Sequence, residues 1–263
     1  MIARRLAIVA AVVAAWMACG WAFRLDAHAY LLLGIPITLA FQRFVARRGV
    51  VRLWTFDDEP VRPRLRSWAW AGSILLVIPL GFLAILLRSG ASLGESTWAL
   101  ASAVGLVIAM ALASAGRIGS RRGWQTALVA AFVGVCVFLL RATHGAAHGM
   151  LWLAMEAVMF FGVMFLLEEV AFRGAFDRFV ARDAAGNRAQ IGTAFAISIL
   201  WGVWHFPVVF ATPADSLSWL GFEIVMFQIA VGVLLSFAAR MGGSLMPPAA
   251  AHALRDAVRD TLG

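Results

Sequence analysis

The feature that most constrains the fold is a succession of apolar runs, each long enough to cross a membrane, with short breaks between them, most of which contain arginine. A spanning helix needs about 20 apolar residues. Of the 263 residues, 62% are hydrophobic and only 14% are charged, which excludes an ordinary water-soluble domain. No polar stretch is long enough for a separate soluble domain. The sequence therefore predicts an all-α, polytopic membrane helix bundle in which residues 1–263 form a single integral membrane domain.

The apolar runs predict about eight transmembrane helices plus a shorter C-terminal helix. The predicted spans are Leu6–Phe23, Tyr30–Val45, Trp68–Leu87, Trp98–Ala115, Trp124–Leu140, Met150–Leu167 continuing to about Phe179, Ile191–Phe210 and Trp219–Ala239, and the terminal helix is predicted from Pro247 to Thr261. The first run follows two arginines and resembles a signal peptide. Its length, and the apolar run that follows closely, favour a retained first helix over a cleaved signal.

The arginines indicate the orientation of the bundle. The chain has no lysine, and the links on one side of the predicted bundle hold most of the arginines, whereas those on the other side hold only Arg24, Arg88 and Arg141. This asymmetry predicts a cytoplasmic N-terminus, and it explains the net charge of +8 without a nucleic-acid partner. The long basic link at residues 46–67 is expected to lie near anionic lipid headgroups. The lysine-free, alanine-rich usage indicates a GC-rich bacterial genome, and hence a bacterial inner membrane.

Two adjacent carboxylates and an arginine, Glu168, Glu169 and Arg173, lie at the end of the sixth apolar run. Ionisable groups in a membrane helix are costly and usually face a bundle interior or a wet cavity. In an α-helix the i,i+4 spacing pairs Glu169 with Arg173, so that Glu168 points elsewhere and is left for chemistry. The alternative is a charge cluster at a helix end near the membrane interface.

The next span contains His205. A single histidine on an apolar helix is ordinarily a hydrogen-bonded core residue. However, Glu168 and His205 are equidistant in sequence from the turn near Gly186, and residues equidistant from the turn of an antiparallel helix pair lie at similar depth. We therefore expect them to face each other.

The terminal helix supplies the remaining candidates. After Pro247 and Pro248, which are tolerated at a helix start, His252 and Asp256 share a helix face at i,i+4 spacing. The alternative is an amphipathic cytoplasmic tail whose polar face also includes Arg255, Arg259 and Asp260.

Three motifs within residues 150–256 carry a family resemblance. Glu168-Glu169-x-x-x-Arg173, Trp201-x-x-x-His205 and His252-x-x-x-Asp256 resemble, in order and internal spacing, those of the CAAX protease and bacteriocin-processing family of intramembrane endopeptidases, which includes the type II CAAX prenyl endopeptidases. The chain departs from the family pattern twice. Trp201 stands where Phe is usual, and Asp256 stands where Asn is frequent. An ionised Asp cannot donate a hydrogen bond to an oxyanion.

The resemblance implies hydrolysis of peptide bonds in a membrane-associated protein or peptide, lipidated or not, inside a water-filled cavity. Glu168 would activate water as general base, His205 would orient the water or move its proton, and His252 with Asp256 would stabilise the oxyanion. Glu169 and Arg173 would brace the helix. The inferred bacterial origin makes a prenylated target less expected.

A metal-assisted form of the same reaction is the alternative mechanism. Zn²⁺ or another divalent metal would be held by Glu168, His205, His252 and Asp256, and Glu169 would then become the base. Without a metal the reaction needs no cofactor.

Two other functions are compatible with the sequence. Glu156 and Glu223, which also lie within spans, are compatible with a proton-coupled transporter, and a non-catalytic membrane scaffold is a further alternative. His144 and His148 have a metal-binding spacing, but their glycine-rich surroundings favour an ordinary polar loop. His-Glu-x-x-His and Gly-x-Gly-Asp motifs are absent, so zincin-like and presenilin-like chemistries have no support.

Overall fold

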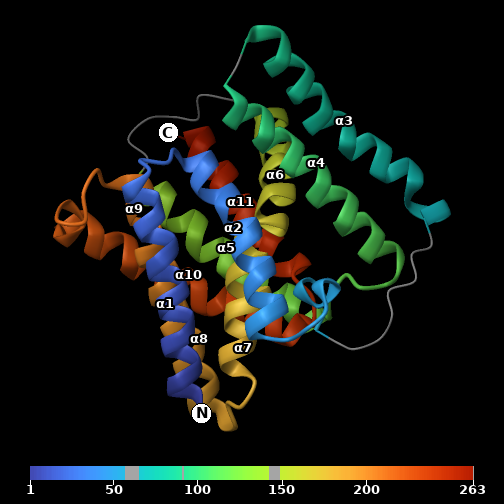
Figure 1. Cartoon of the computed structure of the whole chain (residues 1–263). Helices are drawn as coiled ribbons and strands as arrows, with labels where there is room; N and C mark the ends of the chain where they lie inside the picture. The colour runs from blue at the N-terminus through green and yellow to red at the C-terminus, as the bar shows by residue number, and fades with distance from the viewer. Residues whose placement is uncertain (57–64, 91, 142–148, 263) are drawn as a thin grey trace.

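A computed structural model describes residues 1–56, 65–90, 92–141 and 149–262 (Figure 1). Their regular secondary structure is helical, apart from one isolated β-bridge between Thr55 and Ser244. The long helices are α1 (Ile2–Ala22), α2 (Ala27–Ala40), α3 (Leu65–Ser89), α4 (Leu93–Ser114), α5 (Arg121–Arg141), α6 (Met150–Leu166), α8 (Gly186–Trp204), α10 (Trp219–Gly242) and α11 (Met246–Leu262). The short segments are the π-helices η1 (Phe41–Val45) and η3 (Val170–Asp177), the 3₁₀-helices η2 (Val50–Leu53) and η4 (Asp215–Leu217), and the single turns α7 (Arg178–Ala181) and α9 (Phe206–Val209). The predicted all-α fold is confirmed.

Six segments in the described part of the chain are long and apolar enough to cross a membrane, so the chain is an integral membrane protein. They are Ile2–Ala22, Ala27–Val45, Gly94–Ser114, Met150–Ala181, Gly186–Val209 and Trp219–Gly242. A helix occupies each of the predicted ranges, including the terminal one. The count of about eight spans is not confirmed, because α3 and α5 are helical but do not reach the same criteria within their described residues.

Two predicted spans are interrupted at the points that matter for function. α6 ends at Leu166, and after a turn at Leu167 the chain continues as the π-helix η3 instead of the predicted α-helix. α8 ends at Trp204, because Pro207 has no backbone N–H to continue the ladder, and the predicted extension to Phe210 is the separate turn α9. Wide π turns of this kind are frequent at functional sites. Glu168 and His205 both lie beside these interruptions.

The terminal helix lies inside the bundle. α11 packs against α5, α6 and α10, and α3 lies at the edge of the molecule against α4 (Figure 1). His252, Arg255 and Asp256 are buried on α11. The alternative of an amphipathic cytoplasmic tail is therefore wrong for these residues.

Helices α4 and α6 approach each other at two glycines. A Cβ on Gly105 would collide with the carbonyl oxygen of Gly162, and a Cβ on Gly162 would collide with the carbonyl oxygen of Ser102. Small residues at such crossings let membrane helices pack at backbone distance. This contact sets the position of α6 against α4 in the two turns that precede Glu168.

The described part of the basic link, residues 46–56, is anchored on the bundle. Arg178 donates hydrogen bonds to the carbonyl oxygens of Thr55 at 2.8 Å and Phe56 at 2.9 Å, and Trp54 Nε1 donates to Phe165 O at 3.0 Å. A cavity of about 790 Å³ beside this link is lined by residues that include Arg5, Arg47, Arg48, Arg52, Arg178 and Arg182. The position of the basic link near lipid headgroups stays a prediction.

Candidate active site

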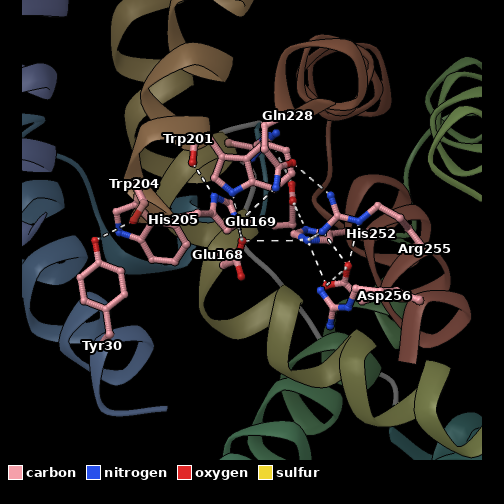
Figure 2. Close-up of polar contacts among 12 residues, drawn as sticks. Tyr30, Glu168, Glu169, Trp201, Trp204, His205, Gln228, His252, Arg255 and Asp256 are labelled. Carbon is pink, nitrogen blue, oxygen red and sulfur yellow. Dashed lines mark hydrogen bonds and ion pairs between the residues drawn. The ribbon is translucent and has the colours of Figure 1, made fainter. Parts of the chain in front are cut away.

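Glu168 and His205 line a cavity of about 380 Å³, and His252 lies behind them, close to Glu168 (Figure 2). Glu168 lies between α6 and η3, His205 follows the last residue of α8, and His252 is on α11. Glu168 Oε2 is 4.0 Å from His205 Nε2 and 3.9 Å from His252 Nε2. The structure thus brings together three residues that the sequence predicted to meet, and the depth argument for Glu168 and His205 is correct.

The indole of Trp201 fixes the Glu168 carboxylate. Trp201 Nε1 donates a hydrogen bond of 3.0 Å to Glu168 Oε2, and both side chains are buried. Phe, the usual residue of the family at this position, has no N–H to donate. The tryptophan therefore adds a hydrogen bond that holds the Glu168 carboxylate in place.

Glu169 and Arg173 are completely buried and form the predicted i,i+4 pair, with Arg173 Nε 3.5 Å from Glu169 Oε2. The Arg173 guanidinium lies 4.1 Å from the centre of the Trp201 ring, and Nη2 is 3.5 Å from the carbonyl oxygen of Gly232. Both charges are buried in the bundle, so they do not form a solvated cluster at a helix end. The bracing role remains a prediction, and these contacts support it.

Arg255 connects the two ends of the third motif. Its Nε donates to Asp256 Oδ1 at 2.8 Å, and its Nη2 lies 2.6 Å from the same oxygen and 2.6 Å from His252 Nε2. His252 Nδ1 is 2.8 Å from Glu169 Oε1. Asp256 therefore acts as a buried counter-ion for Arg255, and His252 links α11 to the Glu169–Arg173 pair.

Gln228 completes the polar lining of the cavity from α10. Its amide lies 3.1 Å from Arg255 Nη1 and 3.3 Å from His205 Nε2. Sequence analysis missed Gln228 and placed Arg255 only on an alternative solvent-facing tail. An amide in a strongly apolar span was the available signal for Gln228.

An aromatic cluster holds the end of α8. Tyr30 Oη donates to the carbonyl oxygen of Trp204 at 2.9 Å, and Trp16 Nε1 donates to that of Tyr30 at 3.0 Å. His205 Nδ1 lies 2.7 Å from the carbonyl oxygen of Trp201. The last turn of α8 is thereby fixed, together with the direction of the His205 ring. Sequence analysis missed Tyr30 because an aromatic residue in an apolar run looks like ordinary core.

The predicted metal ligands do not fit a metal in this arrangement. In the described part of the chain, no three His, Cys, Asp or Glu side chains are placed to share one ion. The cause is Arg255, whose guanidinium takes up the lone pair of His252 Nε2 and pairs with the Asp256 carboxylate. A cation thus already occupies the position between two of the four predicted ligands. The arrangement suits acid–base chemistry by the side chains themselves.

The carboxylates of the transporter alternative lie in different cavities. Glu223 lines the same cavity as Glu168 and accepts a hydrogen bond of 2.7 Å from Trp219 Nε1. Glu156 lines a smaller cavity of about 140 Å³ together with Asp260. His144 and His148 lie outside the described residues.

Residues 90–94 form a Gly-x-Ser-x-Gly sequence that sequence analysis overlooked. Ser92 is the N-cap of α4: its Oγ accepts from the backbone N of Glu95 at 3.2 Å, and the Glu95 carboxylate accepts from the backbone N of Ser92 at 2.9 Å. The pattern here is a capping box, which accounts for its serine without a nucleophilic role.

Comparison with known families supports the resemblance. Residues 147–258 match the family model described as Type II CAAX prenyl endopeptidase Rce1-like. The matched segment contains all three motifs and therefore confirms the predicted family relationship. The searches of curated proteins and of solved structures returned no match.

Proposed function

We propose that this membrane protein, whose C-terminal segment is related to the type II CAAX prenyl endopeptidases, is an intramembrane endopeptidase that hydrolyses a membrane-associated protein or peptide. The observation that carries the proposal is the position of Glu168 Oε2, 4.0 Å from His205 Nε2 and 3.9 Å from His252 Nε2. These separations are too long for direct hydrogen bonds and suit a water molecule held between the groups. A carboxylate and an imidazole facing one water are the elements of general-base hydrolysis.

Glu168 would accept a proton from this water as its oxygen attacks the carbonyl carbon of the substrate. The new C–O bond moves the carbonyl electron pair onto oxygen, which becomes an oxyanion. When the intermediate collapses, the C–N bond breaks and the proton passes to the leaving nitrogen, either from Glu168 or through His205. The products are a carboxylate and an amine, so one water is consumed for each bond cleaved.

Arg255 is the positive group placed to stabilise the oxyanion. It lines the cavity beside Glu168, whereas His252 Nε2 already accepts a hydrogen bond from it. His252 and Asp256 would therefore support the oxyanion indirectly, by holding the guanidinium. A fixed cationic donor placed where negative charge develops is an effective electrostatic catalyst.

The cavity walls suit a substrate that arrives from the membrane. Apolar side chains from α2, α6 and α10 line them, and these include Leu31, Phe160, Met164, Ile224 and Phe227. Such walls would bind apolar segments of a peptide, with or without an attached lipid. The arginine asymmetry supports a cytoplasmic N-terminus, and the composition supports a bacterial inner membrane.

The proposal is tested by comparing peptide termini in membranes from cells that carry the wild-type chain or Glu168→Gln. We expect one or more membrane-associated proteins or peptides to be cleaved in the wild type and to accumulate uncut in the variant. Glu156→Gln is the matched control, because Glu156 lies on α6, the helix that leads to Glu168, and lines a different cavity. Identical termini in all three samples would contradict the proposal and favour a transporter or a scaffold.

A further inference from the structure

Gln228 lies outside the three motifs and contacts His205, and Arg255 lies at an open position of the third motif and contacts His252 (Figure 2). The geometry points to a positioning role: together they hold both imidazoles in the Nδ1–H tautomer, each with Nε2 as a hydrogen-bond acceptor beside Glu168. The catalytic meaning of this inference rests on the proposed function. The hydrogen-bond arrangement itself does not.

The direction of the hydrogen bonds to His205 follows from Arg255. A guanidinium can only donate, so the Gln228 atom 3.1 Å from Arg255 Nη1 is the carbonyl Oε1. The Gln228 amide nitrogen then faces His205 Nε2 at 3.3 Å and donates to it. At the other side of the ring, His205 Nδ1 is 2.7 Å from the carbonyl oxygen of Trp201, which can only accept. The proton is therefore on Nδ1.

The same reasoning fixes His252. Two groups face His252 Nε2: Arg255 Nη2 at 2.6 Å and Asp256 Oδ2 at 3.4 Å. The guanidinium is much the nearer and can only donate, so this nitrogen is the acceptor. His252 Nδ1 is 2.8 Å from Glu169 Oε1 and donates to that buried carboxylate. One guanidinium thus sets the acceptor role of both Nε2 atoms, directly for His252 and through Gln228 for His205.

The surroundings of Arg255 keep it in place. Its guanidinium lies 5.5 Å from the centre of the Trp201 ring and 5.6 Å from that of Phe227, and Asp256 supplies the counter-charge. On the α5 side, a Cβ at Gly134 would lie 2.8 Å from the Cγ of Arg255, so only glycine leaves room for this side chain. A rigid donor at this point costs no reordering during the reaction.

The consequence for the reaction is a division of roles. With their Nε2 atoms as acceptors, the two histidines do not donate to an oxyanion from this side in the resting site. His205 Nε2 instead exchanges its bond to Gln228 for one with the attacking water, and the donor to the oxyanion is Arg255. A wrong tautomer would place an N–H against the Gln228 amide or the guanidinium.

Nitrogen NMR of the purified full-length protein, labelled with ¹⁵N-histidine in detergent micelles, tests the inference without any substrate. His205→Gln and His252→Gln identify the two pairs of signals by their loss. We expect the proton on Nδ1 in both residues, and in Gln228→Met a shift of the His205 Nε2 signal toward that of a nitrogen without a hydrogen bond, with His252 unchanged. A proton on Nε2 of either residue, or an unmoved His205 signal in Gln228→Met, overturns the inference.

Kinetics on the membrane peptide that accumulates in Glu168→Gln cells give the catalytic readout. Gln228→Met should lower kcat by about 10- to 100-fold, as is typical for a lost orienting partner, with KM changed less than about twofold. Gln42→Met is the matched control: Gln42 is equally buried and donates to the carbonyl oxygen of Gly49 at 3.0 Å, so its loss should lower stability and leave kcat intact. A wild-type kcat in Gln228→Met contradicts the positioning role. If no peptide accumulates, the proposed function fails and the NMR result still decides the tautomers.

Discussion

Glu168 Oε2 and His205 Nε2 face each other across 4.0 Å in a cavity between α6, α8 and α11. Trp201 lies on α8, one turn before His205, and its Nε1 donates a hydrogen bond to the same Glu168 oxygen. The end of α8 therefore positions His205 and, through Trp201, also holds the Glu168 carboxylate. The separation between Glu168 and His205 thus depends on the position of α8. This coupling makes the separation a property of the fold.

The Trp201 hydrogen bond gives a first prediction. Trp201→Phe keeps an aromatic ring against Arg173 but removes the N–H that Glu168 accepts. Hydrogen bonds to charged groups contribute about 1.5–3 kcal/mol, so we expect peptide cleavage to fall by about 10- to 100-fold. The control is Trp204→Phe, because Trp204 Nε1 makes no hydrogen bond within the described residues. Equal activity of both variants would show that the Trp201 N–H contributes nothing.

The Glu169–Arg173 pair gives a prediction about stability. Arg173→Met leaves the Glu169 carboxylate buried without its cation, and breaking a buried pair in this way costs about 3–5 kcal/mol. We expect a clearly lower thermal unfolding midpoint in detergent. The double variant Glu169→Gln/Arg173→Met should recover part of the loss, because it removes both charges. If the double variant is as unstable as the sum of the single ones, the pair is not a brace.

The crossing of α4 and α6 gives a third prediction. Gly105→Ala forces a methyl group against the Gly162 backbone, and overpacking of this kind costs about 1–3 kcal/mol. Gly192→Ala on α8 has no atom within 4 Å of the new Cβ, so it should be neutral or slightly stabilising. Thermal unfolding of the two alanine variants checks this. A neutral Gly105→Ala would mean that the helices are farther apart than described.

The contacts of Arg255 give a prediction about metals. Because the guanidinium pairs with both His252 and Asp256, we expect purified protein to cleave its peptide at an unchanged rate after treatment with a chelator. Cleavage rate and bound zinc, measured on the same samples, decide the point. Loss of activity on chelation with recovery on addition of Zn²⁺ would contradict this mechanism and restore the metal-assisted alternative.

The helices and the motif residues could be predicted because their signals are local. An apolar run of about 20 residues predicts a span wherever it occurs, and i,i+4 spacing pairs Glu169 with Arg173 in almost any helical context. The facing of Glu168 and His205 followed from their equal distance to one turn. The bracing and catalytic roles of these residues remain predictions.

The sequence did not predict the π-helix or the contact between Gln228 and Arg255. The π-helix differs from an α-helix by about one residue per turn, and the contact depends on tertiary packing. A π-helix has the same hydropathy as an α-helix of the same residues, so the change of geometry after Leu167 could not be predicted from the sequence. Gln228 and Arg255 are on different helices, and their meeting depends on α11 entering the bundle. The charged residues of α11 kept a solvated tail open as the alternative, although Arg255 is neutralised by its neighbour Asp256. A buried ion pair on one helix thus looks like a solvated face in sequence.

The central claim is that Glu168 activates water for peptide hydrolysis. The most direct test incubates purified protein in H₂¹⁸O with the membrane peptide that accumulates in Glu168→Gln cells, and measures product mass and rate. We predict one ¹⁸O atom in the new C-terminal carboxylate for the wild type and for Glu156→Gln, and a rate at least about 100-fold lower for Glu168→Gln. Cleavage by Glu168→Gln at the wild-type rate, or a product without ¹⁸O, would contradict the account.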